Sequence, residues 1–353
     1  MAKRERGVHP FVTYLLERYY SYQKFQADEG IPAVTGHAVE DVAALPRQPW
    51  ERMGGLGTFI NLSEQQMDDA YVLELPPGAT GRPQRHLFEE VVYVLRGRGA
   101  TSVWQPGGER VSFEWQEGSL FALPLNANYQ HFNGSGDEPA LLLAVTSAPL
   151  MVNLFHSRDF VFGCPYVFTD RFAGAPDEFS RDATLLENVP GTLYETNFLA
   201  DVRKVALTEW AVQGTGVRHT YVALAANTMK IHIADFAVGT YKKAHRHGPG
   251  AHILILNGTG YSLMWPPGTT PQRFDWVPGS FISPPGGWYH QHFNTGTEPV
   301  LHLAFHRPAS IYNKNDRGEI PYADEDPQIR RMFEDELARN GAMSHMPAVG
   351  SAF

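Results

Sequence analysis

The chain is poor in cysteine and has no long run of apolar residues or of charges of one sign. Its single cysteine, Cys164, excludes an intrachain disulfide and suits a reducing compartment. The net charge of −9 is spread along the chain, so no stretch marks a surface for nucleic acid or for a membrane. No segment is long enough to span a bilayer, and the basic N-terminus lacks the apolar stretch of a secretion signal. We therefore expect a cytoplasmic protein without nucleic-acid or membrane partners.

What the chain does have is an internal repeat. A constant step of 161 residues carries Gly78–Asn133 onto Gly239–Asn294 without a gap. The matching positions include Gly97 and Gly258, Trp104 and Trp265, Trp115 and Trp276, Gly118 and Gly279, and Gln130-His131-Phe132-Asn133 and Gln291-His292-Phe293-Asn294. At 353 residues with 43% hydrophobic residues, the chain is long enough and apolar enough for two cores. The repeat therefore predicts two copies of one unit.

Each unit has the pattern of an all-β barrel. Short apolar runs such as Val91–Leu95 and Leu141–Val145 alternate with turn clusters such as Gln105–Gly108. We expect the first barrel at 56–150 and the second at 211–310, joined by an irregular connection at 151–210.

The ends of the chain predict helices. In residues 1–55 we expect an N-terminal helix followed by an extended arm from about residue 31, with aromatic residues near helical spacing over the first thirty residues. These are Phe11, Tyr14, Tyr19, Tyr22 and Phe25, joined by Leu15. Residues 311–353 predict a C-terminal helix, between Asp324 and Gly341, and a tail.

Three histidines of the second unit predict a metal site. His245 and His247 alternate along a strand, so their side chains project from one face, and His290 is the natural third ligand. Three imidazoles that leave open positions are typical of a mononuclear metal site that accepts a substrate. A single inward histidine is usually a hydrogen-bonded core residue, but three clustered imidazoles without a metal are costly to bury.

These motifs resemble those of the cupin superfamily, and the repeat makes the chain similar to a bicupin, with two tandem jelly-roll (double-stranded β-helix) barrels. The cupin pattern has His-x-His, then a glutamate, then a later histidine. The second unit has Ala251 at the glutamate position, which leaves a site of three neutral histidines. The first unit has Gln84, His86, Glu90 and Tyr129, a poor ligand set that predicts a degenerate site. For Glu90 we expect a buried carboxylate paired with Arg85, Arg96 or Arg98.

The segments His245–Ala251 and Trp288–Asn294 resemble the motifs of gentisate and salicylate 1,2-dioxygenases. This resemblance implies that His245, His247 and His290 ligate Fe(II) and that His292 contacts the substrate. The chain differs from that family in carrying the motif in its C-terminal barrel, in having Ile253 where an arginine is expected, and in the insertion of Tyr289.

We therefore expect a mononuclear non-haem Fe(II)-dependent dioxygenase that cleaves a C–C bond of a small hydroxylated aromatic or enolic substrate with O2. The alternatives are a metal-dependent isomerase, lyase or hydrolase without oxygen chemistry, and a non-enzymatic bicupin that binds a small ligand. Ni, Mn, Co, Cu and Zn also suit three histidines. We expect a homodimer or a higher homo-oligomer.

Other residues have candidate roles around this site. His292 is a candidate catalytic residue, although its counterpart His131 also fits an architectural role. The candidate substrate-binding residues are Trp288, Tyr289, Met264 and His252, with Trp265 beside them; His252 faces away from the metal unless a bulge turns it. His302 and His306 fit a pocket lining, the core edge or a solvated face. Arg218, Lys242 and Lys243 could attract a carboxylate near the barrel mouth or could be exposed charges that favour solubility.

Overall fold

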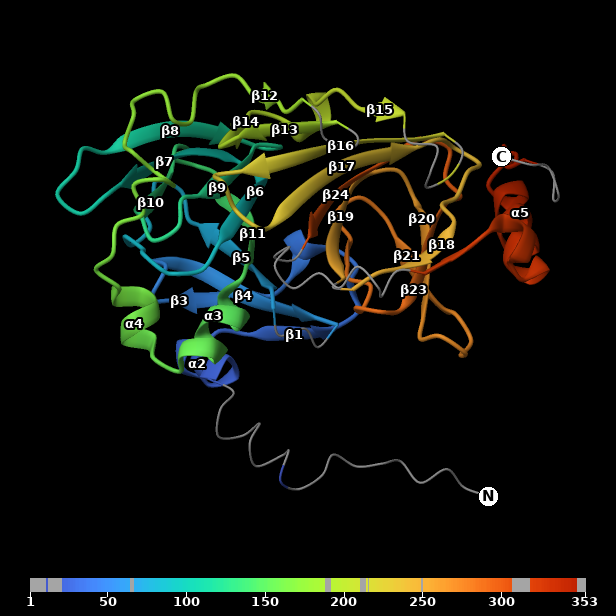
Figure 1. Ribbon diagram of the computed structural model, residues 1–353, viewed down its shortest axis with the longest axis horizontal. Helices are drawn as coiled ribbons and strands as arrows, with labels where there is room; N and C mark the ends of the chain where they lie inside the picture. The colour runs from blue at the N-terminus through green and yellow to red at the C-terminus, as the bar shows by residue number, and fades with distance from the viewer. Residues whose placement is uncertain are drawn as a thin grey trace.

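The computed structural model describes residues 11, 21–63, 67–187, 192–209, 214, 216–248, 250–306 and 318–347. Two β-barrels lie side by side, with helices at both ends of the pair (Figure 1). The predicted all-β fold of two tandem barrels with terminal helices is confirmed. None of the described helices is long and apolar enough to cross a membrane.

The first barrel combines two sheets. The larger has the strand order β1-β4-β5-β11-β6-β9-β14, with β3 beside β4, and the smaller has the order β10-β7-β8. Their bounds are β1 Ala33–Gly36, β3 Gln48–Trp50, β4 Gly55–Leu62, β5 Asp69–Leu75, β6 Glu90–Arg96, β7 Arg98–Trp104, β8 Val111–Gln116, β9 Leu120–Leu123, β10 Asn128–Asn133, β11 Ala140–Thr146 and β14 Phe198–Leu199.

The second barrel repeats this plan. Its larger sheet has the order β12-β13-β16-β17-β24-β19-β22-β2, with β15 beside β16, and its smaller sheet has the order β21-β20-β23-β18-β25. Their bounds are β2 Ala38–Val39, β12 Thr184–Leu185, β13 Leu193–Thr196, β15 Thr208–Glu209, β16 Val217–Leu224, β17 Lys230–Phe236, β18 Ala244–Arg246, β19 Ala251–Asn257, β20 Gly260–Trp265, β21 Gln272–Trp276, β22 Phe281–Ile282, β23 Tyr289–Asn294, β24 Val300–His306 and β25 Gly318–Ile320.

The two arms of the chain cross reciprocally between the barrels. Strand β2 of the N-terminal arm pairs with β22 of the second barrel, and β14 of the connection pairs with β9 of the first. Each arm continues into a 3-10 turn, η1 (Val42–Ala44) or η2 (Val202–Lys204), capped by the side chain of Asp41 or Asp201. The backbone N–H of Val42 donates to Gly279 O, and that of Val202 donates to Gly118 O. Each arm therefore adds an edge strand to the opposite barrel.

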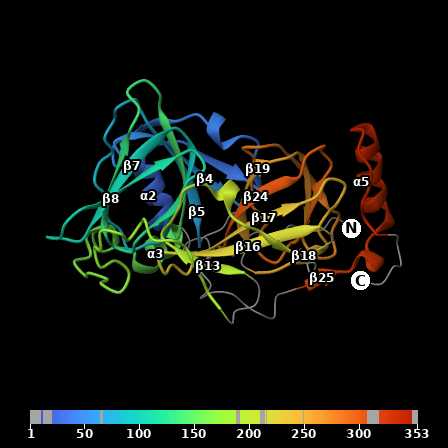
Figure 2. The same cartoon turned by 90° about the horizontal axis from the view of Figure 1, so that it is seen from above.

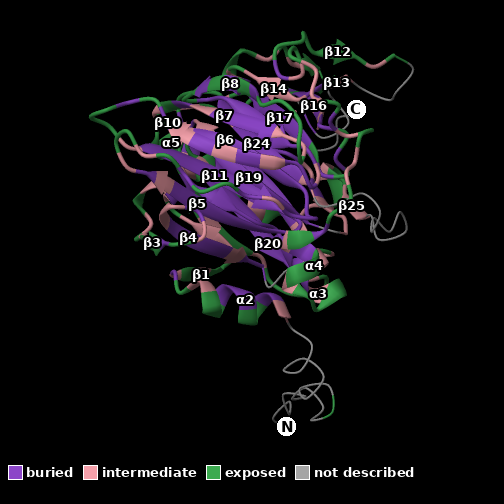
Figure 3. Cartoon of the chain, turned by 90° about the vertical axis from the view of Figure 1, so that its left-hand side faces the viewer, coloured by how far each residue is buried: buried purple, intermediate pink, exposed green. Residues whose placement is uncertain are grey.

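A shared apolar core holds the barrels together. Strand β11 is buried along its whole length, and Leu141, Leu143 and Val145 pack in one cluster with residues of the second barrel. Strands that are buried on both faces have continuous apolar sequences, which explains the run at Leu141–Val145. Figure 3 shows the strands mostly buried, while exposed residues lie mainly on helices and loops. The members from the second barrel include Val222, Leu224, Ile231, Ile233, Leu254, Phe281, Leu303 and Phe305.

The helices cover opposite ends of the molecule. Helices α2 (Ser21–Glu29), α3 (Ala148–Phe155) and α4 (Arg158–Gly163) pack together beside the first barrel, and α5 (Pro327–Arg339) lies beyond the second (Figures 1 and 2). Of the predicted N-terminal helix, Tyr22 and Phe25 are buried, whereas Tyr14, Leu15 and Tyr19 lie outside the described residues. Helix α5 follows the short turn η6 (Tyr322–Asp324) and agrees with the predicted C-terminal helix. Helices α3 and α4 were not predicted.

Candidate metal centre

Three histidines meet inside the second barrel on its smaller sheet. His245 lies on β18 directly opposite His290 on β23, and His247 follows β18. One ring nitrogen from each residue lies within 4.8 Å of the others. The ring centroids of His245 and His290 are 4.3 Å apart, and those of His247 and His290 are 5.0 Å apart. Among the described residues this is the only such group of histidine, cysteine and acidic side chains.

Backbone carbonyls orient two of these rings for metal binding. His245 Nδ1 lies 2.9 Å from Lys243 O, and His290 Nδ1 lies 3.3 Å from Trp288 O. A carbonyl only accepts, so each Nδ1 carries the proton and each Nε2 offers a lone pair, the usual arrangement of a metal-bound histidine. Burial and the neighbouring His245 and His247 lower the pKa of His290 well below its usual value. The neutral imidazole, which is the form that ligates, is therefore favoured, and this donor set fits a metal ion.

Among the described residues, the group of ligand atoms that converge here includes no carboxylate. Ala251 is buried and lies opposite His306 in the pairing of β19 with β24. A divalent ion held by three neutral imidazoles keeps its full positive charge, so the site favours an anionic substrate.

His292 is oriented by a chain of hydrogen bonds from the neighbouring strands. Trp276 Nε1 donates to Ser262 Oγ at 3.0 Å, and Ser262 Oγ lies 2.8 Å from His292 Nδ1. The indole N–H donates to the hydroxyl, and because Ser262 is fully buried its own hydrogen needs an acceptor. His292 Nδ1 is that acceptor, so the neutral ring carries its proton on Nε2. The ring lies on the interior face, with its centroid 5.6 Å from that of His290.

The first barrel contains the same chain of bonds. Trp115 Nε1 donates to Thr101 Oγ1 at 2.9 Å, and that hydroxyl lies 2.7 Å from His131 Nδ1. This arrangement is therefore part of the barrel architecture. In the second barrel, the same hydrogen-bond chain also places the Nε2–H of His292 beside the three histidines. The architectural and the catalytic role that the sequence left open for His292 are therefore compatible.

A second group of histidines lines the larger sheet of the second barrel. His232 Nδ1 lies 2.7 Å from His306 Nε2, and His232 Nε2 lies 3.3 Å from His302 Nε2. The His306 ring is 6.4 Å from that of His247, and the His302 ring is 6.3 Å from that of His292. Burial is the main cause that lowers the pKa of all of them, to about 3 for His306. His302 and His306 are thus interior residues rather than solvated ones.

Two further members of this wall, His219 and His232, had no predicted role. His219 lies on β16, and burial, followed by the charge of Lys242, lowers its pKa to about 4. Their alternation with buried apolar residues along β16 and β17 was the available signal. Because these strands are buried on both faces, that signal does not tell which face turns inward.

Of the predicted substrate-binding residues, Met264 lies near the three histidines, and Trp288 lies half-buried beside the N-terminal arm. Met264 is fully buried and lies directly opposite His290 in the pairing of β20 with β23, so both side chains face inward. Trp288 is half-buried, and its ring lies 5.2 Å from that of His37, which follows β1 in the N-terminal arm.

The other two face elsewhere. Tyr289 alternates with His290 along β23, so it lies on the outer face, stacked 5.6 Å from Trp265 in the apolar cluster that includes Phe333 of α5. His252 is fully buried between the barrels, stacked on Phe281, with Nε2 3.5 Å from Asp68 Oδ2. The geometry supports substrate contact for neither Tyr289 nor His252, because β19 and β23 are regular at these positions.

The corresponding place in the first barrel is a sealed polar network. His86 Nε2 lies 3.1 Å from Glu90 Oε2, and the hydroxyl of Tyr71 donates to Glu90 Oε1 at 2.7 Å. Gln84 lines the same small space, and its Nε2 donates to Arg52 O. Burial raises the pKa of Glu90, but the bonds with His86 and Tyr71 outweigh it, and the pKa is lowered. The arginine partner that we expected for Glu90 is therefore wrong.

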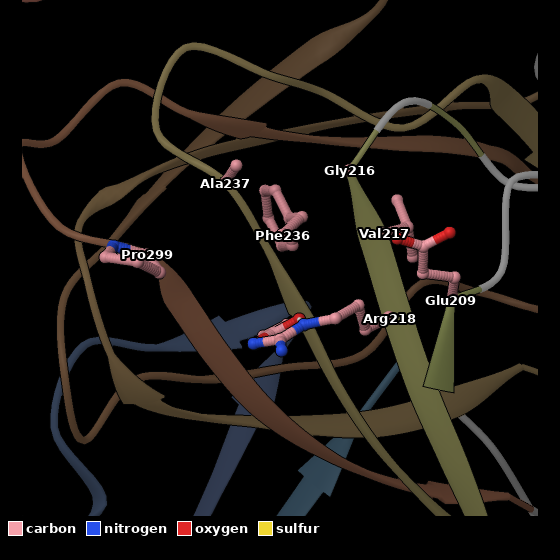
Figure 4. A pocket seen from close by; sticks show the side chains of 8 residues that line it. Glu209, Gly216, Val217, Arg218, Phe236, Ala237 and Pro299 are labelled. Atoms are coloured by element: carbon pink, nitrogen blue, oxygen red, sulfur yellow. The ribbon is translucent and has the colours of Figure 1, made fainter. Parts of the chain in front are cut away.

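Two cavities, one in each barrel, are lined by residues other than the three histidines. In the first barrel, the space beside His86 and Glu90 measures only about 30 Å³ and has mostly aromatic walls. On the second barrel, an open surface hollow of about 360 Å³ is lined by Arg218 and Asp235, with Phe236 beside them (Figure 4). Arg218 forms an ion pair with Asp235, so it is not a free carboxylate anchor.

Comparison with known proteins supports the fold. No protein-family model matches the chain, and no curated protein matches it. A mutant of the oxalate decarboxylase of Bacillus subtilis has 15% sequence identity and a TM-score of 0.54, covering 86% of this chain and 84% of that one. A formate complex of the oxalate decarboxylase of Lactobacillus farciminis has 16% identity and a TM-score of 0.54, covering 89% of this chain and 97% of that one.

A third structure concerns the Mn(II) centres of the Bacillus subtilis oxalate decarboxylase. It has 14% identity and a TM-score of 0.54, covering 90% of this chain and 88% of that one. These structures are decarboxylases rather than ring-cleaving dioxygenases. At such low identity the likeness establishes the fold alone, which is a tandem pair of β-barrels.

Proposed function

We propose that this protein is a metal-dependent lyase that breaks a C–C bond of a small carboxylate substrate inside the second barrel. The observation that carries the proposal is the convergence of three histidine nitrogens within 4.8 Å, beside the oriented N–H of His292. The likeness in fold to oxalate decarboxylases favours a lyase over the dioxygenase that the sequence motifs suggest.

Each interior residue has a role in this proposal. His245, His247 and His290 would hold the ion, which supplies positive charge that stabilises negative charge on a substrate oxygen. His292 Nε2–H would donate a hydrogen bond to the substrate and stabilise the negative charge that develops as CO2 departs, while water supplies the proton that the remaining carbon takes up. Ser262 and Trp276 keep that N–H aimed inward. Met264 provides an apolar wall that excludes water.

For the metal we propose Mn(II) or Fe(II). Three imidazoles suit several first-row ions, so the donor set alone leaves Ni, Co, Cu and Zn open. Fe(II) follows from the motif resemblance, and Mn(II) follows from the likeness to a decarboxylase whose Mn(II) centres have been studied.

The second candidate is an Fe(II)-dependent dioxygenase acting on a hydroxylated aromatic or enolic substrate. The observation that favours it is the set of three neutral ligands with Ala251 at the position of the usual glutamate. O2 as a co-substrate and a homo-oligomeric assembly both remain predictions.

The two candidates differ in their use of O2. Protein purified without added metal would be analysed for bound elements, then loaded with Mn(II) or Fe(II). It would be incubated with oxalate, malonate, 2-oxo acids, gentisate and salicylate while CO2 release and O2 uptake are recorded. The lyase releases one CO2 per turnover and consumes no O2. One O2 consumed per product formed would favour the dioxygenase, and absence of both metal and turnover would favour a non-enzymatic binding protein.

A further inference from the structure

Lys242 is a buried cation inside the second barrel. Its side chain is only 2% exposed, and its backbone N–H donates to His292 O at 3.0 Å. The equivalent residue of the first barrel is Gly81, whose N–H donates to His131 O at 2.9 Å. The barrel fold therefore needs only the backbone at this position, and the ammonium group is an addition particular to the second barrel.

The ammonium group lacks a carboxylate partner among the described residues. Lys242 Nζ lies 3.5 Å from His302 Nε2 and 5.4 Å from the ring centroid of Phe236. The acidic residue next to Phe236, Asp235, is paired with Arg218, and the neighbouring Lys243 has Glu319 as its partner. Burial lowers the pKa of Lys242 to about 7, and the charge of Asp235, which raises it, does not offset the cost of burying the ammonium group.

Lys242 lies among the interior histidines rather than at the barrel mouth. Burial is the largest cause of the low pKa of His292 and His302, and the charge of Lys242 is the next for both. For His290 the neighbouring charges are those of His245, His247 and His292 instead. The ring centroid of His292 lies 5.6 Å from that of His290 and 6.3 Å from that of His302, whose Nε2 is 3.5 Å from Lys242 Nζ, so His292 lies between the three-histidine site and the His302–Lys242 pair.

The charge balance of this interior favours a substrate with two negative charges. A divalent ion on three neutral histidines, together with the ammonium group, would form a positive interior, and the described carboxylate that acts on Lys242, Asp235, is already paired with Arg218. A ligand with one carboxylate would neutralise only part of this charge. A ligand with a carboxylate at each end would place one negative charge at each positive centre, with the N–H of His292 beside it.

We propose that Lys242, with His302 beside it, binds a second carboxylate of the substrate, so that the substrate class is a short dicarboxylate. This inference rests on the proposed function for the first carboxylate, which the ion holds. It makes Lys242 a specificity-determining residue, with His302 as the neutral partner that orients its ammonium group.

The experiment compares Lys242→Met with the matched control Lys230→Met. Lys230 is exposed on β17 of the same barrel, so the control removes the same charge from the surface. Calorimetric titration of the Mn(II)-loaded proteins would use two ligand pairs that differ in the second carboxylate: malonate with propionate, and 2-oxoglutarate with 2-oxovalerate. The same titrations would be repeated on metal-free protein.

We expect wild-type protein to bind at least one dicarboxylate about ten- to a hundredfold more tightly than its monocarboxylate partner. Lys242→Met should abolish that preference and leave monocarboxylate affinity within about twofold, while Lys230→Met changes neither. Loss of Lys242 should also raise the Tm, because a buried cation is replaced by an apolar side chain of similar length. A folded Lys242→Met protein that keeps the preference overturns the inference.

Failure of the proposed function would look different. If the ion does not contribute, metal-free and metal-loaded proteins bind each ligand equally, although Lys242 still favours dicarboxylates. If Lys242 does not contribute, the ion increases the binding affinity for the dicarboxylate and for its monocarboxylate partner equally. That result contradicts the inference about Lys242 but agrees with the metal site.

Discussion

The two barrels share one backbone plan but differ in the residues that face inward. At equivalent positions the first barrel has Tyr71, Leu142 and Thr146, and the second has His232, His302 and His306. The largest exchange involves a pair. Glu90 lies opposite Thr146 in the first barrel, whereas Ala251 lies opposite His306 in the second. The second barrel therefore has alanine in place of the carboxylate of Glu90 on β19, and the imidazole of His306 in place of Thr146 on the neighbouring strand β24.

This difference shows how the same fold holds either a closed network or an open site. In the first barrel, Glu90 contacts the Nε2 of His86, and tyrosines fill the remaining space. In the second, the carbonyls of Lys243 and Trp288 accept from the Nδ1 atoms of His245 and His290, so the Nε2 atoms of these histidines are left for a metal ion. Function therefore depends on a few inward side chains rather than on the barrel itself.

The strongest test of this contrast removes one histidine from each barrel. His290→Ala should lower metal affinity by more than about a hundredfold, because one of three ligands is lost. His86→Ala should leave the metal content unchanged, since the Nε2 of His86 already contacts Glu90. Elemental analysis after gel filtration measures both. Loss of metal from His86→Ala alone would place the centre in the first barrel and reverse the comparison.

A second test separates the architectural and catalytic roles of the shared hydrogen-bond chain. Ser262→Ala and Thr101→Val each remove the hydroxyl that orients a histidine, so each should cost about 1–2 kcal/mol of unfolding free energy. Only Ser262→Ala should reduce kcat, by about ten- to a hundredfold, because only His292 faces the metal centre. Denaturation curves and CO2 release measure the two effects, and an equal loss of kcat in both variants would contradict a local role.

A third test concerns the closed network of the first barrel. Glu90→Gln removes a buried charge that accepts from His86 and Tyr71, and should cost about 2 kcal/mol of unfolding free energy. Metal content and turnover should remain at wild-type levels, because the network lies outside the metal centre. Urea denaturation of the metal-free protein measures the cost. A variant more stable than wild type would show that the network is not a stabilising contact.

The smallest expected effect is on the pH dependence of stability. Burial lowers the pKa of His131 in the first barrel and of His219 in the second to about 4. Between that value and about 6.5, the unfolded chain binds protons that the folded chain does not, so stability is lost as the pH falls. His219→Gln should reduce this slope by at most about 1.4 kcal/mol per pH unit. Metal-free protein unfolded in urea at pH 5, 6 and 7 measures it, and an unchanged slope would contradict the assignment.

Local sequence patterns were sufficient for the barrels and for the three histidines. The gapless repeat requires two similar units, and alternation along a strand places His245 and His247 on one face. They were not sufficient for Tyr289, which we expected in an aromatic wall of the substrate pocket beside Trp288, whereas the alternation of β23 turns it outward. For His252, the regular strand that the sequence favoured leads it into the interface between the barrels.

The repeat and the spacing of its histidines were determined by the sequence alone, because both depend only on the order of residues along the chain. The exchange of β2 and β14 between barrels, the wall of His219, His232, His302 and His306, and the burial of Lys242 were decided only by the tertiary structure. Each depends on strands distant in sequence and on which face of a doubly buried sheet turns inward. Local periodicity carries no information on that choice.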